Sequence, residues 1–143
     1  MAATTGTSGF GTLLKAGNGG SPTETFTTIA EIKSISGPQL SIEMIDATHM
    51  ESPSSYREMK PSFKDGGEVT FDVNFLPANA THTALTTDFE AKTLRNFKIT
   101  WPNTGATVWS FSAYVTGFQP SAAIDDMLSA SVTLKISGAV TIV

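Results

Sequence analysis

The side chains best suited to chemistry are few in this sequence, and they lie far apart. The chain has two histidines, His49 and His82, and no cysteine. A two-histidine metal site needs further ligands, and the spacing supplies none near either residue. Without cysteine there can be no disulfide, zinc–thiolate site or cysteine nucleophile. We therefore expect both histidines to be surface residues and expect no bound metal.

Three other short motifs have simpler explanations than catalysis. Asp125-Asp126 could form an acid pair, but its position before the last predicted strand is typical of a solvated turn. Gly9-Phe10-Gly11 lacks both the preceding strand and the following Lys-Ser/Thr of a phosphate loop. Asn79-Ala80-Thr81 matches a glycosylation acceptor, but without a secretion signal Asn79 is more simply a helix cap. No Ser-His-acid constellation can be argued for, so we expect neither an enzyme nor a cofactor.

The composition favours a single, mainly β domain. The chain has 143 residues and a mass of 15.1 kDa, with 40% apolar and only 15% charged residues. Serine and threonine together occupy 36 positions, and threonine suits a pleated, half-buried surface. The formal charge of −4 argues against tight binding to nucleic acid. No apolar run approaches the ~20 residues that cross a bilayer, so we expect no membrane contact.

Alternating apolar and polar residues predict most of the strands. The clearest case is segment 68–75, in which every second residue is apolar. Weaker or similar patterns occur in segments 25–36, 39–46, 95–101, 108–118 and 129–137. Strands with one apolar face must bury that face against another layer. The predicted fold is therefore a β-sandwich or flattened barrel of two packed antiparallel sheets, with Phe71 and Trp109 assigned to its core.

One segment has the pattern of a helix. Asn79 can cap a helix over residues 79–93, on which Leu85 and Phe89 share one face. Asp88 and Lys92 are four residues apart and would form an exposed ion pair. We expect this helix to cover an open end or edge of the sandwich.

Two further segments have no regular period. Residues 1–23 are rich in Gly, Ser and Thr and are predicted to form an N-terminal arm, which leaves 24–143 as one domain. Residues 47–67 are predicted to form a long loop. Loops of this length are usually functional or disordered, and this one carries apolar side chains that are typical of interfaces.

The order of these segments resembles the tail tube protein of long-tailed, non-contractile, lambda-like bacteriophages (siphoviruses). The resemblance covers residues 24–143, and its most specific parts are GGEVTFDVNFLP before the helix and FKITWPNTGATVWSFSAYVTGF. It implies a structural virion protein, the major tail tube subunit, of which six copies close into a ring. Stacked hexameric rings would form the hollow conduit for DNA ejection into the host. Tubes of contractile phages and type VI secretion share this architecture, so the kind of tail stays open.

The resemblance also implies the partners and the location. The chain would bind copies of itself, enclose a tape-measure protein and passing double-stranded DNA, and meet tail tip and tail terminator proteins. Its place would be the phage tail in the virion, after assembly in the cytoplasm of the bacterial host. The long loop would contact the next ring through Met50, Tyr56, Arg57, Met59 and Phe63.

DNA must slide along the tube wall without binding to it. Lysine or arginine in the lumen would add affinity for phosphate, whereas acidic and hydroxyl side chains would not. The candidates for the lumen come from the polar strand faces: Glu43, Glu68, Asp72, Ser110, Ser112 and Thr133.

Another class of protein fits the same pattern of strands. A monomeric β-sandwich that binds carbohydrate or a host surface is the alternative to the tail tube, and an enzyme comes third. Electron microscopy of the purified protein separates these, because hollow tubes favour the first hypothesis and single particles the second.

Overall fold

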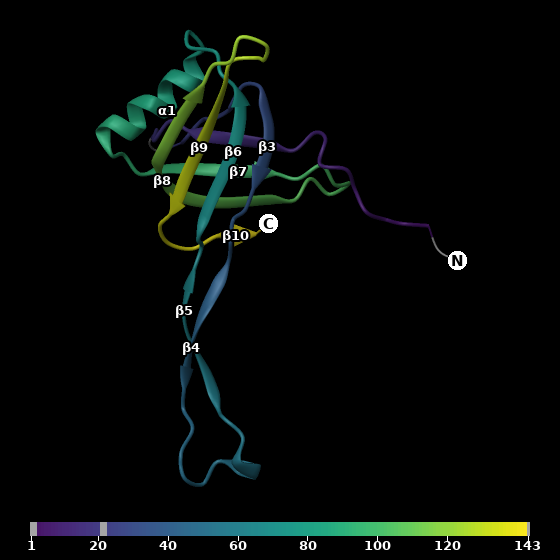
Figure 1. Ribbon diagram of the computed structural model, residues 1–143, viewed down its shortest axis with the longest axis vertical. Coiled ribbons are helices and arrows are strands. Elements are labelled where there is room, and N and C mark those ends of the chain that lie inside the picture. Colours follow the sequence, from purple (N-terminus) through teal and green to yellow (C-terminus); the bar gives the residue numbers. More distant parts are fainter. Residues whose placement is uncertain (1–2, 21–22, 143) are drawn as a thin grey trace.

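The computed structural model describes residues 3–20 and 23–142 (Figure 1). The chain is mainly β with one α-helix, which confirms the predicted fold class. Its elements are β1 (Leu13–Gly17), β2 (Phe26–Thr28), β3 (Ile32–Ser36), β4 (Ser41–Asp46), η1 (Pro53–Ser55), β5 (Met59–Asp65), β6 (Glu68–Asn74), α1 (Ala80–Ala91), β7 (Arg95–Thr100), β8 (Val108–Ser121), β9 (Ser129–Ile136) and β10 (Thr141–Ile142).

The body of the molecule is one antiparallel sheet that folds over itself. Its strand order is β2-β1-β7-β8-β9-β6-β3, and β10 pairs with β8. The 14-residue strand β8 pairs with β7 through its first part and with β9 through its second, with a register shift between Val115 and Gly117. Figure 1 shows β7 running across β6 and β9. The two packed antiparallel layers are thus two halves of a continuous sheet that share β8.

The core lies between these two halves. Buried residues alternate along β6 and β9, as the period-two pattern predicted. Phe71 of β6 is 1% exposed and belongs to the core. Trp109 is only half-buried, and its ring packs edge-on against Trp101 with 5.7 Å between ring centroids. The assignment of Trp109 to the core was therefore too strong, because this residue stands at the end of the β7–β8 hairpin, where the layers open.

The helix begins where the sequence predicted. The Asn79 side chain accepts a hydrogen bond of 2.9 Å from the backbone N–H of Thr81. Of the two residues predicted to share one face of the helix, Leu85 is buried in the core and Phe89 is 45% exposed. The predicted exposed pair between Asp88 and Lys92 is wrong. Asp88 is only 5% exposed and faces β7, and Lys92 ends the helix in the left-handed region at φ 55°.

His82 is completely buried, so the prediction that both histidines lie on the surface is right for His49 and wrong for His82. The backbone N–H of Leu76 donates to Nδ1 of His82 over 3.0 Å. Nε2 therefore carries the ring proton and donates to the carbonyl oxygen of Ala30 over 2.7 Å. The imidazole thus joins α1 to the connection between β2 and β3.

Two predicted irregular segments contain strands. β1 lies within the predicted arm 1–23, pairs with β2 and β7, and buries Leu14 completely. Residues 1, 2, 21 and 22 of that segment lie outside the described residues. The predicted loop 47–67 contains η1 and β5, and β5 pairs with β4. The sequence of β5, MKPSFKD, does alternate apolar and polar residues, so the prediction that 47–67 has no regular period was wrong for this part. Pro61 within the run argues against a strand, and the structure nevertheless pairs the run with β4.

Candidate assembly surface

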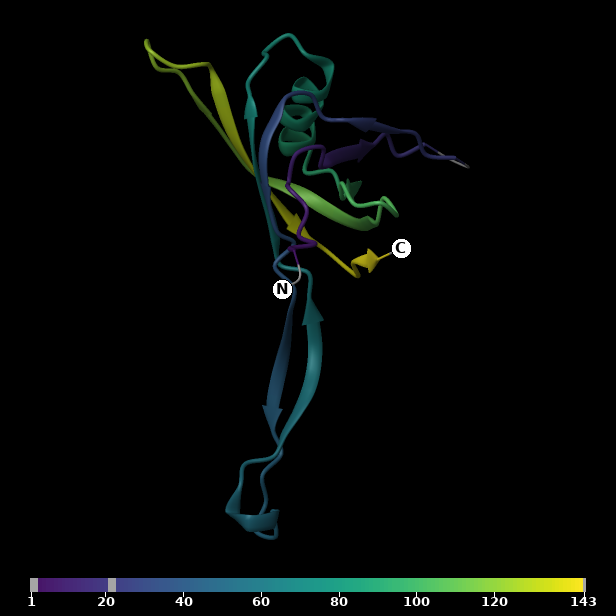
Figure 2. The ribbon, with the colours of Figure 1, turned by 90° about the vertical axis from the view of Figure 1, so that its right-hand side faces the viewer.

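A two-stranded hairpin projects from the body of the molecule (Figures 1 and 2). We call residues 41–65, which include β4, η1 and β5, the β4–β5 arm. Its register runs from Ser41 opposite Asp65 to Asp46 opposite Met59, with an irregularity between Ile42 and Met44. An isolated two-stranded hairpin is only marginally stable in water. The arm therefore has little to stabilise it until another surface covers it.

The arm and the residue before it concentrate the exposed apolar side chains. Tyr56 is 77% exposed and Phe63 is 80% exposed. The other exposed large apolar residues of this stretch are Leu40, Ile42, Met44, Ile45, Met50 and Met59. Contiguous apolar surface of this kind marks an interaction site in soluble proteins. Aromatic residues and methionine are also enriched at interfaces.

All five residues predicted to contact the next ring lie on this arm. Met50, Tyr56 and Arg57 are at its tip, and Met59 and Phe63 are on β5. The Arg57 side chain is mostly exposed, with Nη1 3.8 Å from Oδ2 of Asp46. The alternation along β4 suggested a core strand, and the structure instead leaves its apolar residues open for a partner.

The tip of the arm is held by polar contacts. The Ser52 hydroxyl donates to Oε2 of Glu58 over 2.6 Å, and Nδ1 of His49 lies 3.0 Å from the same oxygen. The backbone N–H of Glu58 donates to the Thr48 hydroxyl over 2.9 Å. Hydrogen bonds from the side chain and the backbone of Thr48 hold the pKa of the Asp46 carboxyl below its usual value. These contacts give the tip a defined shape despite its lack of a core.

The six residues predicted to line a lumen do not form one patch. Glu68, Asp72 and Thr133 share the outer face of β6 and β9. The hydroxyls of Ser34 and Ser131 donate to the Asp72 carboxylate, so the acid is held by neutral donors. This face is rich in hydroxyls, and it also carries Lys135, which is opposite Glu68 and 3.7 Å from Oδ1 of Asp65.

The remaining candidates lie elsewhere. Ser110 and Ser112 are on β8 opposite Lys98 and Asn96, and Lys98 is in turn opposite Lys15 of β1. That part of the sheet is cationic rather than acidic. Glu43 lies on the β4–β5 arm, away from both sets. The structure therefore separates residues that sequence patterning had grouped.

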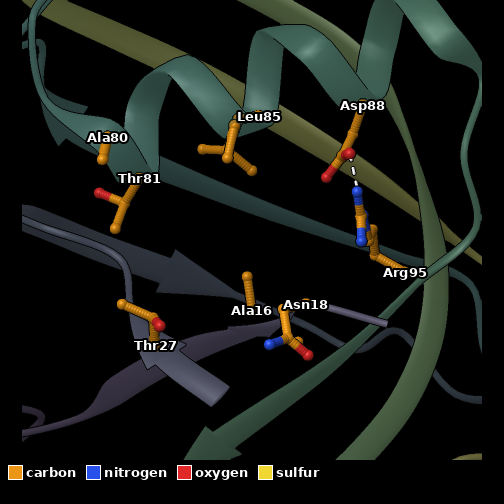
Figure 3. Close-up of a pocket in the computed structure, with 10 residues that line it drawn as sticks. Ala16, Asn18, Thr27, Ala80, Thr81, Leu85, Asp88 and Arg95 are labelled. Carbon is orange, nitrogen blue, oxygen red and sulfur yellow. Dashed lines mark hydrogen bonds and ion pairs between the residues drawn. The ribbon is translucent and has the colours of Figure 1, made fainter. Parts of the chain in front are cut away.

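A pocket of about 270 Å³ lies between α1 and strands β1 and β2 (Figure 3). Its two charged residues bind each other, because Nε of Arg95 donates to Oδ1 of Asp88 over 2.9 Å. The rest of its lining is mainly small or apolar side chains, so the pocket offers little to anchor a polar ligand. Within residues 3–20 and 23–142, no three His, Asp or Glu side chains gather in a way that could hold a metal ion. None of the helical segments described has the length and apolarity that a membrane crossing requires.

A body of folded antiparallel sheet with an uncovered apolar hairpin is typical of a structural subunit that binds other chains. The sequence model of the lambda phage tail tube protein family matches residues 13–143. The chain belongs to this family and is a structural tail tube subunit, a component of the phage tail. A comparison with curated protein sequences gave no match.

Solved structures with the same fold come from several tail-like assemblies. The chain is similar to the tail of an empty gene transfer agent particle, with a TM-score of 0.74 at 20% identity over 92% of this chain and 94% of that one. The native gene transfer agent particle gives a TM-score of 0.74 at 18% identity over 96% and 99%. A sheath/tube terminator of an extracellular contractile injection system gives 0.72 at 14% identity over 99% of both. At these identities the likeness establishes the fold.

Proposed function

We propose that six copies of this chain close into a ring, that rings stack into a hollow tube, and that the tube conducts phage DNA during ejection into the host. The observation that carries this proposal is the exposed β4–β5 arm on a subunit of the tail tube family. The similar tail of the gene transfer agent particle is described with sixfold symmetry. The exposed arm favours this function over a monomeric binding module, because a monomer would leave the apolar side chains of the arm in water.

Ring closure would use the edges of the main sheet. The end strands β2 and β3 each pair on one side only. Unpaired edges favour pairing with another chain unless they are blocked. A closed ring satisfies every such edge with a neighbouring copy.

Stacking of the rings would use the β4–β5 arm, with Met50, Tyr56, Arg57, Met59 and Phe63 as contact residues. The arm is already a paired hairpin, so docking orders less chain than an irregular loop would. Docking would remove the apolar side chains of the arm from water, and this burial would supply the free energy that drives stacking.

The lumen would be lined by the outer face of β3, β6 and β9, with Glu68, Asp72 and Thr133. Hydroxyl groups from Ser34 and Ser131 surround the acid there, and such groups do not displace counterions from DNA. The basic residue of β9 on this face, Lys135, is opposite Glu68 and lies 3.7 Å from Oδ1 of Asp65, so its charge is partly balanced. A tape-measure protein and double-stranded DNA would occupy this lumen in turn, and tip and terminator proteins would close the tube ends. The subunit would act without catalysis and would assemble in the cytoplasm of the bacterial host.

Electron microscopy of the purified full-length protein tests this proposal. We expect hollow tubes with sixfold symmetry in cross-section at high concentration, or after a tail tip complex is added. Single particles under all of these conditions, with a monomer mass by light scattering, would overturn it.

A further inference from the structure

A second uncovered surface lies at the turn between β8 and β9. Residues 122–128 connect these strands beyond the body of the molecule (Figure 2). Ile124 is fully exposed at this turn and Met127 is 65% exposed. The backbone N–H of Phe75 donates to the carbonyl oxygen of Leu128 over 2.8 Å, which fixes the base of the turn to the end of β6. We call residues 122–128 the β8–β9 tip.

The β8–β9 tip and the β4–β5 arm lie at opposite ends of the long axis of the molecule, as both ribbon views show (Figures 1 and 2). A contact between two different surfaces on opposite ends repeats from copy to copy without closing on itself. Such a contact builds a stack.

The two surfaces also have complementary chemistry. The tip carries Asp125 and Asp126, both exposed, and no basic residue. Strand β5 carries Lys60 and Lys64, both exposed, and neither forms an ion pair with another described residue. The acids of the arm are already occupied in part, since Glu58 binds Ser52 and His49.

The apolar residues match in the same way. Ile124 and Met127 of the tip are exposed without a partner surface, as are Met44 and Met59, which share one face of the arm. Methionine adapts its shape to irregular contacts. An apolar centre with charged pairs at its rim is the usual construction of a protein interface.

We infer that the β8–β9 tip of one copy is the docking surface for the β4–β5 arm of a second copy. This inference rests on the proposed stacking of rings and names the surface that receives the arm. Ile42, Met44, Met59 and Lys64 share one face of the arm, by its strand register. Ile124 and Met127 would pack against Met44 and Met59, and Asp125 and Asp126 would face Lys64.

Cross-linking tests the contact directly, because the natural chain has no cysteine. Met59→Cys and Met127→Cys on one chain, treated in tubes with a short bis-maleimide, should give a ladder of linked chains. Each single variant should give no ladder. The matched control combines Met59→Cys with Thr87→Cys, an exposed position on α1, and should also give none.

Charge reversal supplies an independent test. Asp125→Lys with Asp126→Lys should abolish tubes and leave folded rings, and so should Lys64→Glu. The three changes together should restore tubes, whereas Glu90→Lys on the exposed face of α1 should have no effect.

The outcomes separate this inference from the proposed function. Wild-type protein that forms no tubes would overturn both. If the wild type forms tubes, two results would overturn the docking surface and leave the tube function intact. These are tubes of the Met59→Cys, Met127→Cys variant that give no ladder and normal tubes from the Asp125→Lys, Asp126→Lys variant.

Discussion

Nε of Arg95, at the start of β7, donates a hydrogen bond of 2.9 Å to Oδ1 of Asp88 in α1 (Figure 3). The Asp88 side chain is 7% exposed and that of Arg95 is 27% exposed. The pair therefore ties the last turn of the helix to the sheet in an environment that contains little water.

Removal of the arginine should destabilise the subunit. Arg95→Leu leaves the Asp88 carboxylate buried without its partner, and such a loss costs about 3 kcal/mol. Urea unfolding should show this decrease in the free energy of unfolding. Lys92→Ala, which removes the partner that sequence spacing suggested, should change it by less than about 0.5 kcal/mol. Equal losses for both variants would show that the Asp88–Arg95 pair has no special role.

Replacement of the buried histidine should be costly for a different reason. His82→Phe keeps a ring of similar size but leaves the Leu76 N–H and the Ala30 carbonyl without their partner. Each unsatisfied group costs about 1–3 kcal/mol, so thermal unfolding should occur at a clearly lower temperature. His49→Phe at the exposed tip serves as the control and should unfold like the wild type. A His82→Phe protein with unchanged stability would contradict this assignment.

The two aromatic residues first assigned to the core should differ. Phe71→Ala opens a cavity in the centre of the sheet and should cost about 3–5 kcal/mol, enough to unfold or aggregate the subunit. Trp109→Ala removes a half-buried ring and should cost less, with a folded product by circular dichroism. A larger loss at Trp109 than at Phe71 would be inconsistent with their observed burial.

A pair of phenylalanine variants separates assembly from folding. Phe63→Ser on the arm should leave a folded subunit that forms no tubes, because the ring is exposed in the monomer and would be covered in the stack. Phe89→Ser on α1 is the matched control, also exposed, and should form tubes normally. The readouts are circular dichroism for the fold and electron microscopy for the tubes. Normal tubes from Phe63→Ser would remove this residue from the contact.

Acid should loosen the tip of the arm. The hydrogen bonds from Thr48 lower the pKa of Asp46 in the folded chain relative to the unfolded chain. The stabilisation is therefore present above about pH 4, the usual range of a free aspartate, and is lost as the pH falls through the lowered pKa. Hydrogen exchange at the Thr48 amide should accelerate in acid beyond its intrinsic pH dependence. Asp46→Asn should not show this response, and the same acid response in that variant would assign it to another group.

Several elements could be predicted because they depend on interactions between residues that are close in the sequence or on a regular period. Strands β6 and β9 each have one face on the core, so burial selects apolar residues at every second position. Asn79 caps α1 through a contact with its own neighbour Thr81, which needs no distant partner. The predicted order of strand, helix and hairpin also resembled the family whose sequence model matches residues 13–143.

Other features depended on contacts between distant parts of the chain. Two basic residues, Lys92 and Arg95, are close enough to Asp88 in the sequence to form an ion pair with it. Asp88 lies on the side of α1 that packs against β7, so its partner is Arg95. Histidine is usually a surface residue, so the sequence did not indicate that His82 is buried. Its hydrogen-bond acceptor is the carbonyl oxygen of Ala30, 52 positions earlier in the chain.

The position of the β4–β5 arm also depends on contacts that residue types do not specify. The sequence alone determined a mainly β chain with apolar anchors in residues 47–67, because residue type and period are local properties. Only the tertiary structure decided that β5 pairs with β4 and that both strands stand clear of the core. The alternation in β4 and β5 marks one apolar face on each strand, and it does not say whether that face meets the core of the same chain or another chain.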